Sequence, residues 1–254
     1  MIKIKTEKEI EIMAEGGKIL AKIMEKLKEA VKPGIKTKDL EKLAKELIKK
    51  IGGKCSFLGY KSSKSEKPYP ACLCTSINEE LVHVPPSNRV LKEGDIISLD
   101  IGLLWKGYHL DMAKTFPVGK ISFEAQRLIR VTKKALKLAI KKAKVGNTFG
   151  DIGNTIQRYV QGQGFSVIRE LCGHGIGKDL HEEPQILNYG KRKTGPKIKE
   201  GMVFCIEPMV AVGDWHLEKT KDGFGYKTKD NSLCAHFEHT IAIVEGKAKI
   251  LTKP

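Results

Sequence analysis

The stretch LKEGDIISLD, residues 91–100, decides the fold, because it ends an apolar strand on a charge. Residues 96–99 are β-branched or apolar apart from one serine, as in a buried strand. The next residue is Asp100. An ionised carboxylate in an apolar setting is costly, so it must be solvated, paired or bound to a metal ion.

A second stretch, IKEGMVFCIE at residues 198–207, repeats this pattern. When the shared Lys-Glu-Gly is aligned, Asp100 falls opposite Glu207. Beyond the two strands, Asp111 and Glu238 each stand eight residues before a glycine. Each part of the chain thus supplies one carboxylate at a strand end and another on a later strand.

The repeat extends to the segments KPGIKTKDL at 32–40 and KVGNTFGDI at 144–152. Three matches in the same order predict two related halves, about residues 1–120 and 121–254, within a single domain that spans 1–254. Packing about a pseudo-twofold axis would bring the four carboxylates together. Four like charges in an apolar cleft cannot all stay ionised, whereas two divalent cations would balance them. Four separate surface acids remain the alternative.

Hydrophobic periodicity predicts an α+β chain. Helices are expected at 7–31, 38–51, 122–144 and 148–162, and strands near 71–77, 95–104, 111–117, 165–171, 202–212 and 236–244. A loop rich in Ser, Lys, Gly and Pro is expected over 55–70.

Length and composition are those of a soluble globular protein. The 254 residues can bury a proper core, and 41% of them are hydrophobic. No apolar run approaches the roughly 20 residues of a membrane span. The segment MIKIK at 1–5 lacks the apolar core of a signal peptide. We therefore expect a cytoplasmic protein that does not cross a membrane.

The six cysteines form no C-x-x-C pair, so zinc-finger spacing is absent. Cys72-x-Cys74 is a weak metal signal. Reduced thiols are expected for a cytosolic protein.

The net charge of +16 favours a polyanionic neighbour such as nucleic acid. The lysines are spread along the chain without a basic tail, so solvated helix faces explain the charge about equally well.

Three histidines stand beside rigid backbone. His174 lies in Gly-His-Gly-Ile-Gly, whose glycines permit close backbone approach. His181 follows seven residues later, and His83 stands in LVHVPP, where two prolines stiffen the loop. A single histidine is more often structural. Three of them in a chain with four paired carboxylates favour a functional site.

These motifs resemble those of type I methionine aminopeptidases, which have the pita-bread fold of the creatinase and aminopeptidase superfamily. The resemblance runs from about residue 6 to 252, through LVHVPP, GDIISLDIGLLWKGYHLDMAKTF, GHGIGKDLHEEP, FCIEPM and FEHT. It implies two pseudo-symmetric αβ halves, with a central antiparallel sheet and outer helices. It also implies a metalloprotease that excises the N-terminal methionine during protein maturation, when the second residue is small.

The resemblance implies two divalent ions, and the family's ligands fall on Asp100, Asp111, His174, Glu207 and Glu238. Such a donor set suits Co²⁺, Mn²⁺, Fe²⁺ or Zn²⁺. A water between the ions would become the nucleophilic hydroxide. The resemblance makes Glu207 the general base, His181 the donor to the oxyanion and His83 a contact of the scissile amide nitrogen. A monovalent cation held by backbone carbonyls would leave no signature in the sequence.

An apolar pocket for the methionine side chain is implied, with walls at Phe57, Tyr60, Tyr69, Cys74, Leu180 and Phe224. Aromatic rings suit a polarizable thioether. Many bacterial relatives have Cys, Phe and Trp where Phe57, Leu180 and Phe224 stand, so altered methionine affinity is expected. The loop 60–70 also looks several residues longer than the usual bacterial form.

The substrates implied are nascent polypeptide N-termini, and the charge suggests salt-sensitive ribosome association of a monomer. Two other functions remain open. A related Xaa-Pro peptidase shares the ligands but usually carries a large additional N-terminal domain. A non-catalytic binding protein on the same fold would tend to lose ligands, and this chain keeps all five.

Overall fold

The computed structural model describes residues 1–61, 63 and 67–254. Its helices are α1 (Glu7–Ala30), α2 (Thr37–Lys50), α3 (Phe123–Lys142) and α4 (Phe149–Gly162). Capping residues fix several of these ends: Thr6 and Thr148 form capping boxes with Glu9 and Asp151, three residues on. All four helices predicted from periodicity are confirmed within about two residues at each end.

The strands in the described residues form several antiparallel sheets. They are β1 (Lys54–Cys55), β2 (Leu73–Ile77), β3 (Glu80–Val82), β4 (Ile96–Trp105), β5 (Tyr108–Pro117), β6 (Ser166–Val167), β7 (Cys172–Gly175), β8 (Glu182–Leu187), β9 (Val203–Ile206), β10 (Met209–Ala211), β11 (Leu217–Lys219), β12 (Tyr226–Thr228), β13 (Cys234–His236), β14 (His239–Val244) and β15 (Lys247–Ile250). In the two largest sheets, β4 pairs with β1, β2 and β5, and the second sheet has the order β15-β14-β9-β7-β8.

Two predicted strands are divided in the structure. The strand expected at 202–212 becomes β9 and β10, which belong to different sheets. Pro208 stands between them and cannot donate a hydrogen bond to a ladder. The strand expected at 236–244 is likewise divided into β13 and β14. Each break leaves a glutamate, Glu207 or Glu238, between two strands rather than within one.

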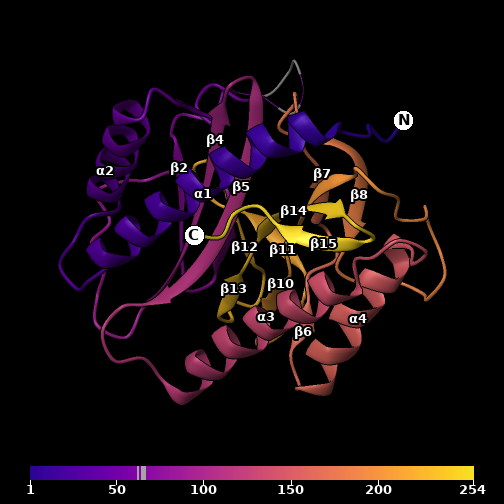
Figure 1. Cartoon of the computed structure of the whole chain (residues 1–254). Coiled ribbons are helices and arrows are strands. Elements are labelled where there is room, and N and C mark those ends of the chain that lie inside the picture. Colours follow the sequence, from indigo (N-terminus) through magenta and orange to yellow (C-terminus); the bar gives the residue numbers. More distant parts are fainter. Residues whose placement is uncertain (62, 64–66) are drawn as a thin grey trace.

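Two helical pairs cover the sheets from outside (Figure 1). One hydrophobic cluster joins α1 and α2 to β2, β4 and β5, and a second joins α3 and α4 to β9 and β14. The strands β5 and β14 join the two parts: the Thr240 hydroxyl donates to the carbonyl of Asp111 at 2.7 Å, and the amide of Glu238 donates to the carbonyl of Ala113 at 2.8 Å. The relation of the two halves by a pseudo-twofold axis stays a prediction.

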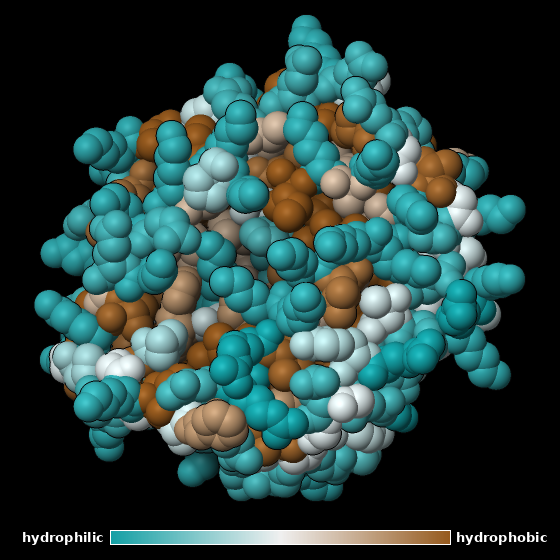
Figure 2. Space-filling model, turned by 60° about the horizontal axis from the view of Figure 1, so that its bottom comes forward, coloured by the Kyte–Doolittle hydropathy of each residue, from teal (hydrophilic) through white to brown (hydrophobic). Residues whose placement is uncertain are grey.

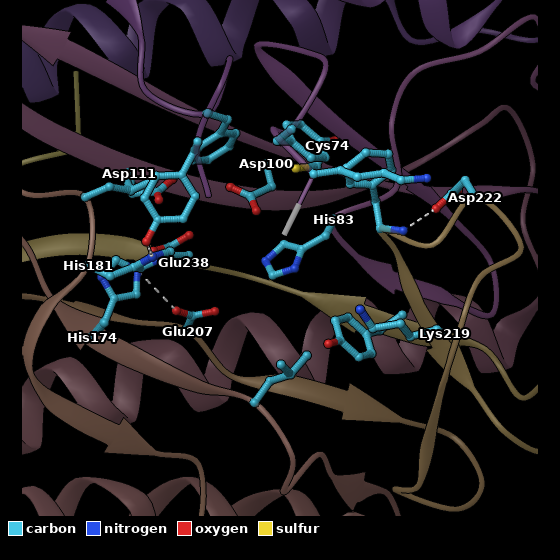
Figure 3. A pocket seen from close by; sticks show the side chains of 18 of the residues that line it. Cys74, His83, Asp100, Asp111, His174, His181, Glu207, Lys219, Asp222 and Glu238 are labelled. Atoms are coloured by element: carbon cyan, nitrogen blue, oxygen red, sulfur yellow. Dashed lines mark hydrogen bonds and ion pairs between the residues drawn. The ribbon is translucent and has the colours of Figure 1, made fainter. Parts of the chain in front are cut away.

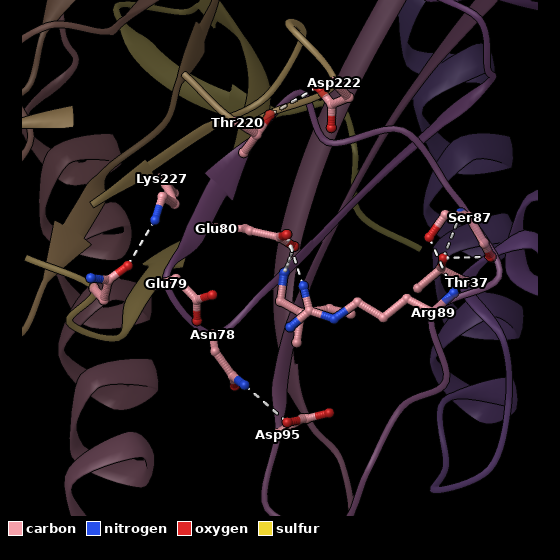
Figure 4. Close-up of polar contacts among 12 residues, drawn as sticks. Thr37, Asn78, Glu79, Glu80, Ser87, Arg89, Asp95, Thr220, Asp222 and Lys227 are labelled. Atoms are coloured by element: carbon pink, nitrogen blue, oxygen red, sulfur yellow. Dashed lines mark hydrogen bonds and ion pairs between the residues drawn. The ribbon is translucent and has the colours of Figure 1, made fainter. Parts of the chain in front are cut away.

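The connection between β3 and β4 is held by polar contacts at both ends (Figure 4). The Thr37 hydroxyl donates to the carbonyl of Ser87 at 3.1 Å, and the guanidinium of Arg89 lies 2.8 Å from the carboxylate of Glu80. His83, at the start of this connection, has a φ of 60°, in the left-handed region that few side chains adopt. The contacts fix the backbone that presents His83.

Cys55 and Cys72 form a disulfide, so the expectation of six reduced thiols is wrong for these two residues. Cys55 ends β1, which pairs with Leu103 and Leu104 of β4, and Cys72 lies just before β2, which pairs with Ile97–Ile101 along the same edge of β4. This sheet geometry brings the two thiols together, which spacing in the sequence could not reveal. The other cysteines are free.

No helix in the described residues is long and apolar enough to cross a membrane. Figure 2 shows the face that lies at the bottom of Figure 1, with hydrophilic side chains over most of it and small hydrophobic areas between them. Phe123, at the start of α3, is a large hydrophobic side chain that is 73% exposed.

Candidate metal centre and substrate cavity

The first two carboxylates come from one hairpin. Asp100 on β4 pairs with Ala113, and Asp111 on β5 pairs with Gly102, so the two aspartates lie diagonally across the ladder on one face. Both are buried, at 7% and 4% exposure. The strand that begins at Ile96 therefore carries its charge inward.

The other two carboxylates lie at the ends of a second strand pair. Glu207 directly follows β9 and Glu238 directly precedes β14, and His239 pairs with Ile206 in the register of these strands. Both side chains are buried. The contact of Glu238 with Ala113 places this pair beside the hairpin, so all four carboxylates meet in one place (Figure 3).

His174 on β7 completes the cluster. Its Nδ1–H donates to the carbonyl of Gly175 at 2.9 Å, which leaves Nε2 directed at the carboxylates, 3.7 Å from Oε1 of Glu207. A Cβ atom at Gly173 would lie 2.4 Å from the carbonyl oxygen of Cys205, and one at Gly175 would lie 2.1 Å from that of Glu183. Close backbone approach therefore requires both glycines, as the sequence predicted.

The electrostatics of this cluster are those of a cation site. Burial, followed by the charge of neighbouring carboxylates, raises the pKa of Asp111, Glu207 and Glu238 well above the ordinary range. Burial lowers the pKa of His174 to about 3, so its imidazole is neutral and can donate an electron pair. One buried oxygen each of Asp100, Asp111 and Glu238 has no hydrogen-bond partner.

The donor atoms lie close enough to share ions. Ligand atoms of Asp100, Asp111 and Glu238 lie within 4.8 Å of one another, as do those of His174, Cys205 and Glu238. Unpartnered carboxylate oxygens and a neutral imidazole are donors that divalent transition metals accept. The residues present therefore fit divalent metal binding.

An apolar cavity of about 560 Å³ opens beside these ligands (Figure 3). All the residues predicted as pocket walls line it, namely Phe57, Tyr60, Tyr69, Cys74, Leu180 and Phe224. Tyr69 meets Phe57 and Phe224 edge to face, at ring distances of 6.4 and 5.8 Å. Although the loop before it is long, Tyr69 reaches the cavity; residues 62 and 64–66 of that loop lie outside the described residues.

His83 and His181 also line the cavity. The ring of His181 lies 4.3 Å from that of His174, and its Nδ1 lies 2.5 Å from the hydroxyl of Tyr60. The pKa of His181 is lowered to about 4. Burial has the largest effect, and the nearby positive charges of protonated His83 and His109 add to it. Neutral at pH 7, His181 can donate one hydrogen bond into the cavity.

Sequence reasoning missed several residues of the site. His236 is 1% exposed, and its Nε2 lies 3.3 Å from Oε2 of Glu207. Its position two residues before Glu238 was the available signal, since such neighbours can share one face of an extended segment. Lys219 and Asp222 line the cavity mouth, and only the chain fold brings them there.

Comparison with known proteins agrees with this site. The model of metallopeptidase family M24 matches residues 11–245. The chain is 48% identical to methionine aminopeptidase 1 of Bacillus subtilis over 253 residues, covering 100% of both chains. It is 46% identical to the methionine aminopeptidase of Clostridium acetobutylicum, covering 99% of each.

Among solved structures, the methionine aminopeptidase of Thermotoga maritima matches with a TM-score of 0.96 at 44% identity, covering 100% of both chains. Prolidase from Pyrococcus furiosus matches less closely, with a TM-score of 0.76 at 26% identity. The present chain covers only 65% of that prolidase. The additional length of the prolidase is the difference expected between the two classes of enzyme.

Proposed function

The chain belongs to metallopeptidase family M24, and we propose that it removes the N-terminal methionine of polypeptides with two divalent ions held by its five clustered ligands. It has the pita-bread fold of the methionine aminopeptidases, and like them it is a hydrolase and an aminopeptidase. The observation that carries the proposal is the convergence of unpartnered carboxylate oxygens at the inner end of an apolar cavity.

The proposed ligands are Asp100, Asp111, His174, Glu207 and Glu238. The four carboxylates would supply oxygen ligands to the ions, and His174 would supply its Nε2. When bound, Co²⁺, Mn²⁺, Fe²⁺ or Zn²⁺ would supply an acidified water as the nucleophile. Glu207 would serve as the general base of the hydrolysis.

The histidines of the cavity act on the peptide bond. His181 lies beside His174, where its neutral imidazole donates a hydrogen bond to the scissile carbonyl as negative charge develops. His83 contacts the amide nitrogen of that bond. The apolar walls around Tyr69 take the methionine side chain, because a thioether packs well against aromatic edges.

We further infer that the second residue of the substrate must be small, because overfilling a packed site costs roughly 1–3 kcal/mol. The substrates are nascent chains in the cytoplasm, and the enzyme acts as a monomer that the +16 charge draws to ribosomes. A monovalent cation held by backbone carbonyls is compatible with this assignment.

The test is a metal-depleted protein assayed on Met-Gly-Met, Met-Lys-Met and an Xaa-Pro dipeptide after single metals are added back. We expect cleavage of the first peptide alone, and only with a divalent metal. Rapid cleavage of Met-Lys-Met would refute the size rule. Cleavage of the Xaa-Pro dipeptide would instead assign the chain to the prolidases, and turnover without metal would refute the metal assignment.

A further inference from the structure

The imidazole of His236 is a buried polar group that none of the roles above includes. It lies at the end of β13 and is 1% exposed. Neither ring nitrogen makes an aligned hydrogen bond. A buried polar group without a partner is costly, so such a group in a packed site calls for an explanation.

The carboxylate of Glu207 lies beside this ring, between two imidazoles. Its Oε1 is 3.7 Å from Nε2 of His174, and its Oε2 is 3.3 Å from Nε2 of His236. The two oxygens are therefore not equivalent: one faces a proposed ligand, and the other faces a ring that the proposed ligand set does not contain.

The backbone around His236 is rigid enough to set this contact. Its amide donates to the Thr115 hydroxyl oxygen at 2.9 Å, and that hydroxyl in turn donates to the carbonyl of His236 at 2.9 Å. The Ser98 hydroxyl lies 2.8 Å from the same oxygen, and His236 pairs with Met209 in the ladder between β13 and β10. Contacts to β5 and β10 thus fix the backbone that carries the imidazole.

We propose that His236 is a positioning residue that donates from Nε2–H to Oε2 of Glu207 and so keeps Oε1 directed at the metal side of the site. Groups that hydrogen-bond to metal ligands fix their orientation, and losing one typically costs about 10–100-fold in metal affinity or activity. This inference rests on the proposed function, because it assigns Glu207 to the metal centre.

The test compares three substitutions that differ in where they place a donor. In His236→Gln the side-chain amide nitrogen reaches about as far as Nε2, whereas in His236→Asn it reaches only as far as Nδ1. His236→Leu keeps an apolar shape without a donor. Each metal-free variant is titrated with Mn²⁺ in a calorimeter, and kcat and KM are measured on Met-Gly-Met. His216→Gln, an exposed imidazole paired with Asp214 at 2.6 Å, is the matched control.

We expect His236→Asn and His236→Leu to lose about 10–100-fold in affinity for one Mn²⁺ or in kcat, with KM within about threefold. His236→Gln should recover most of both. The positioning role would be refuted if His236→Asn and His236→Leu bound Mn²⁺ with wild-type affinity and cleaved Met-Gly-Met with wild-type kcat. A Gln variant as impaired as Leu would also refute it, because the ring itself would then be required.

Two further outcomes distinguish the positioning role of His236 from a folding defect in the Leu variant and from failure of the proposed peptidase function. Melting curves show whether the Leu variant folds, and if it does not, the comparison of Gln with Asn still decides. A wild-type protein that binds Mn²⁺ but cleaves no peptide would refute the proposed function alone, since the calorimetric comparison would still measure the effect of His236 on the metal centre.

Discussion

The hydroxyl of Tyr60 lies 2.5 Å from Nδ1 of His181, although the two residues are 121 positions apart in the sequence. Tyr60 comes from the connection between β1 and β2, and His181 directly precedes β8. The oxyanion role proposed for His181 needs its proton on Nε2, and in that tautomer the Tyr60 phenol donates to Nδ1. Tyr60 therefore does more than line the pocket, because it sets the tautomer in which His181 can donate.

Replacing His181 with Ala should lower kcat by about 10²–10³, the usual cost of one lost donor to an oxyanion. Tyr60→Phe should lower kcat by about tenfold, since the tautomer is then less well fixed. Metal content, measured by elemental analysis, should stay at the wild-type value in both variants. Loss of metal from His181→Ala would mean that this residue is a ligand.

Asp100→Asn and Glu238→Gln should each weaken the binding of at least one divalent ion and reduce turnover by orders of magnitude. Both carboxylates have a buried oxygen without a protein partner, so a neutral amide there removes the charge that holds the ion. Calorimetry and peptide cleavage measure the two effects. Glu46→Gln, on the exposed face of α2, is the control. Wild-type activity with two ions bound would contradict the assignment of these ligands.

The metal-free protein should lose stability as the pH rises from about 6.5 to 8. The carboxyls of Asp111 and Glu207 have a raised pKa in the folded state, caused by burial first and then by neighbouring acids. The folded state therefore binds more protons than the unfolded state, and the free energy of unfolding falls with rising pH. Burial lowers the pKa of His174 and His236, which opposes this trend only below about pH 6.5.

Thermal melting at both pH values, with and without Mn²⁺, measures this effect. Added Mn²⁺ should raise Tm more at pH 8, because its ligands have fewer protons to release there. A metal-free protein whose Tm increases across this range would show that the carboxyls do not hold protons in the folded state.

Reducing the disulfide between Cys55 and Cys72 should destabilise the protein by about 3 kcal/mol, the value for a loop of this length. The bond joins residues 17 positions apart and closes the segment that carries Phe57, Tyr60 and Tyr69, so KM should also rise. Dithiothreitol should lower Tm of the wild type and leave a Cys55→Ser/Cys72→Ser variant unchanged. An equal effect on both proteins would exclude this bond as the cause.

Ribosome binding should weaken as salt increases, because phosphate neutralisation releases counterions. The sequence points to the lysine-rich segments 61–67 and 191–199 as contacts. Part of the first segment, residues 62 and 64–66, lies outside the described residues. Lys67 lines the cavity, so substitutions in the first segment would also change the wall of the substrate site.

The second segment gives the cleaner test. Replacing its basic residues with glutamine should reduce co-sedimentation with ribosomes and flatten its salt dependence, while cleavage of short peptides stays at the wild-type rate. Its lysines are exposed and absent from the lining of the cavity. If co-sedimentation with ribosomes did not depend on salt concentration, the positive charge of the protein would serve only to keep its surface hydrated.

The sequence predicted the four helices and the proposed ligands because both leave local or repeated signals. Helices appear in the hydrophobic period, and Asp100 and Glu207 appear in a repeated segment, although Asp100 lies within β4 rather than at its end, as only Glu207 does. Pro208 in the sequence marks the break between β9 and β10, because proline cannot donate to a strand ladder. A prediction of one continuous strand over 202–212 places Glu207 inside the strand, whereas the structure places it between two strands.

The remaining features depend on contacts between distant segments. The bond between Cys55 and Cys72 depends on β1 and β2 lying end to end along one edge of β4, and the contact of His236 with Glu207 depends on β13 lying beside β10. The contact of Tyr60 with His181 spans even more of the chain. None of these pairs has a characteristic spacing, so a single sequence contains no signal for them.

The link between β5 and β14 has a consequence for how the enzyme is made. The hairpin with Asp100 and Asp111 can form once the first half of the chain has left the ribosome, but Glu238 and Thr240 follow more than a hundred residues later. At about 5–20 residues per second, several seconds or more pass between synthesis of Asp111 and synthesis of Glu238, the last of the five proposed ligands. We therefore expect peptidase activity to appear abruptly near the end of synthesis, so that abandoned fragments of this protein are inert towards the newly made chains around them.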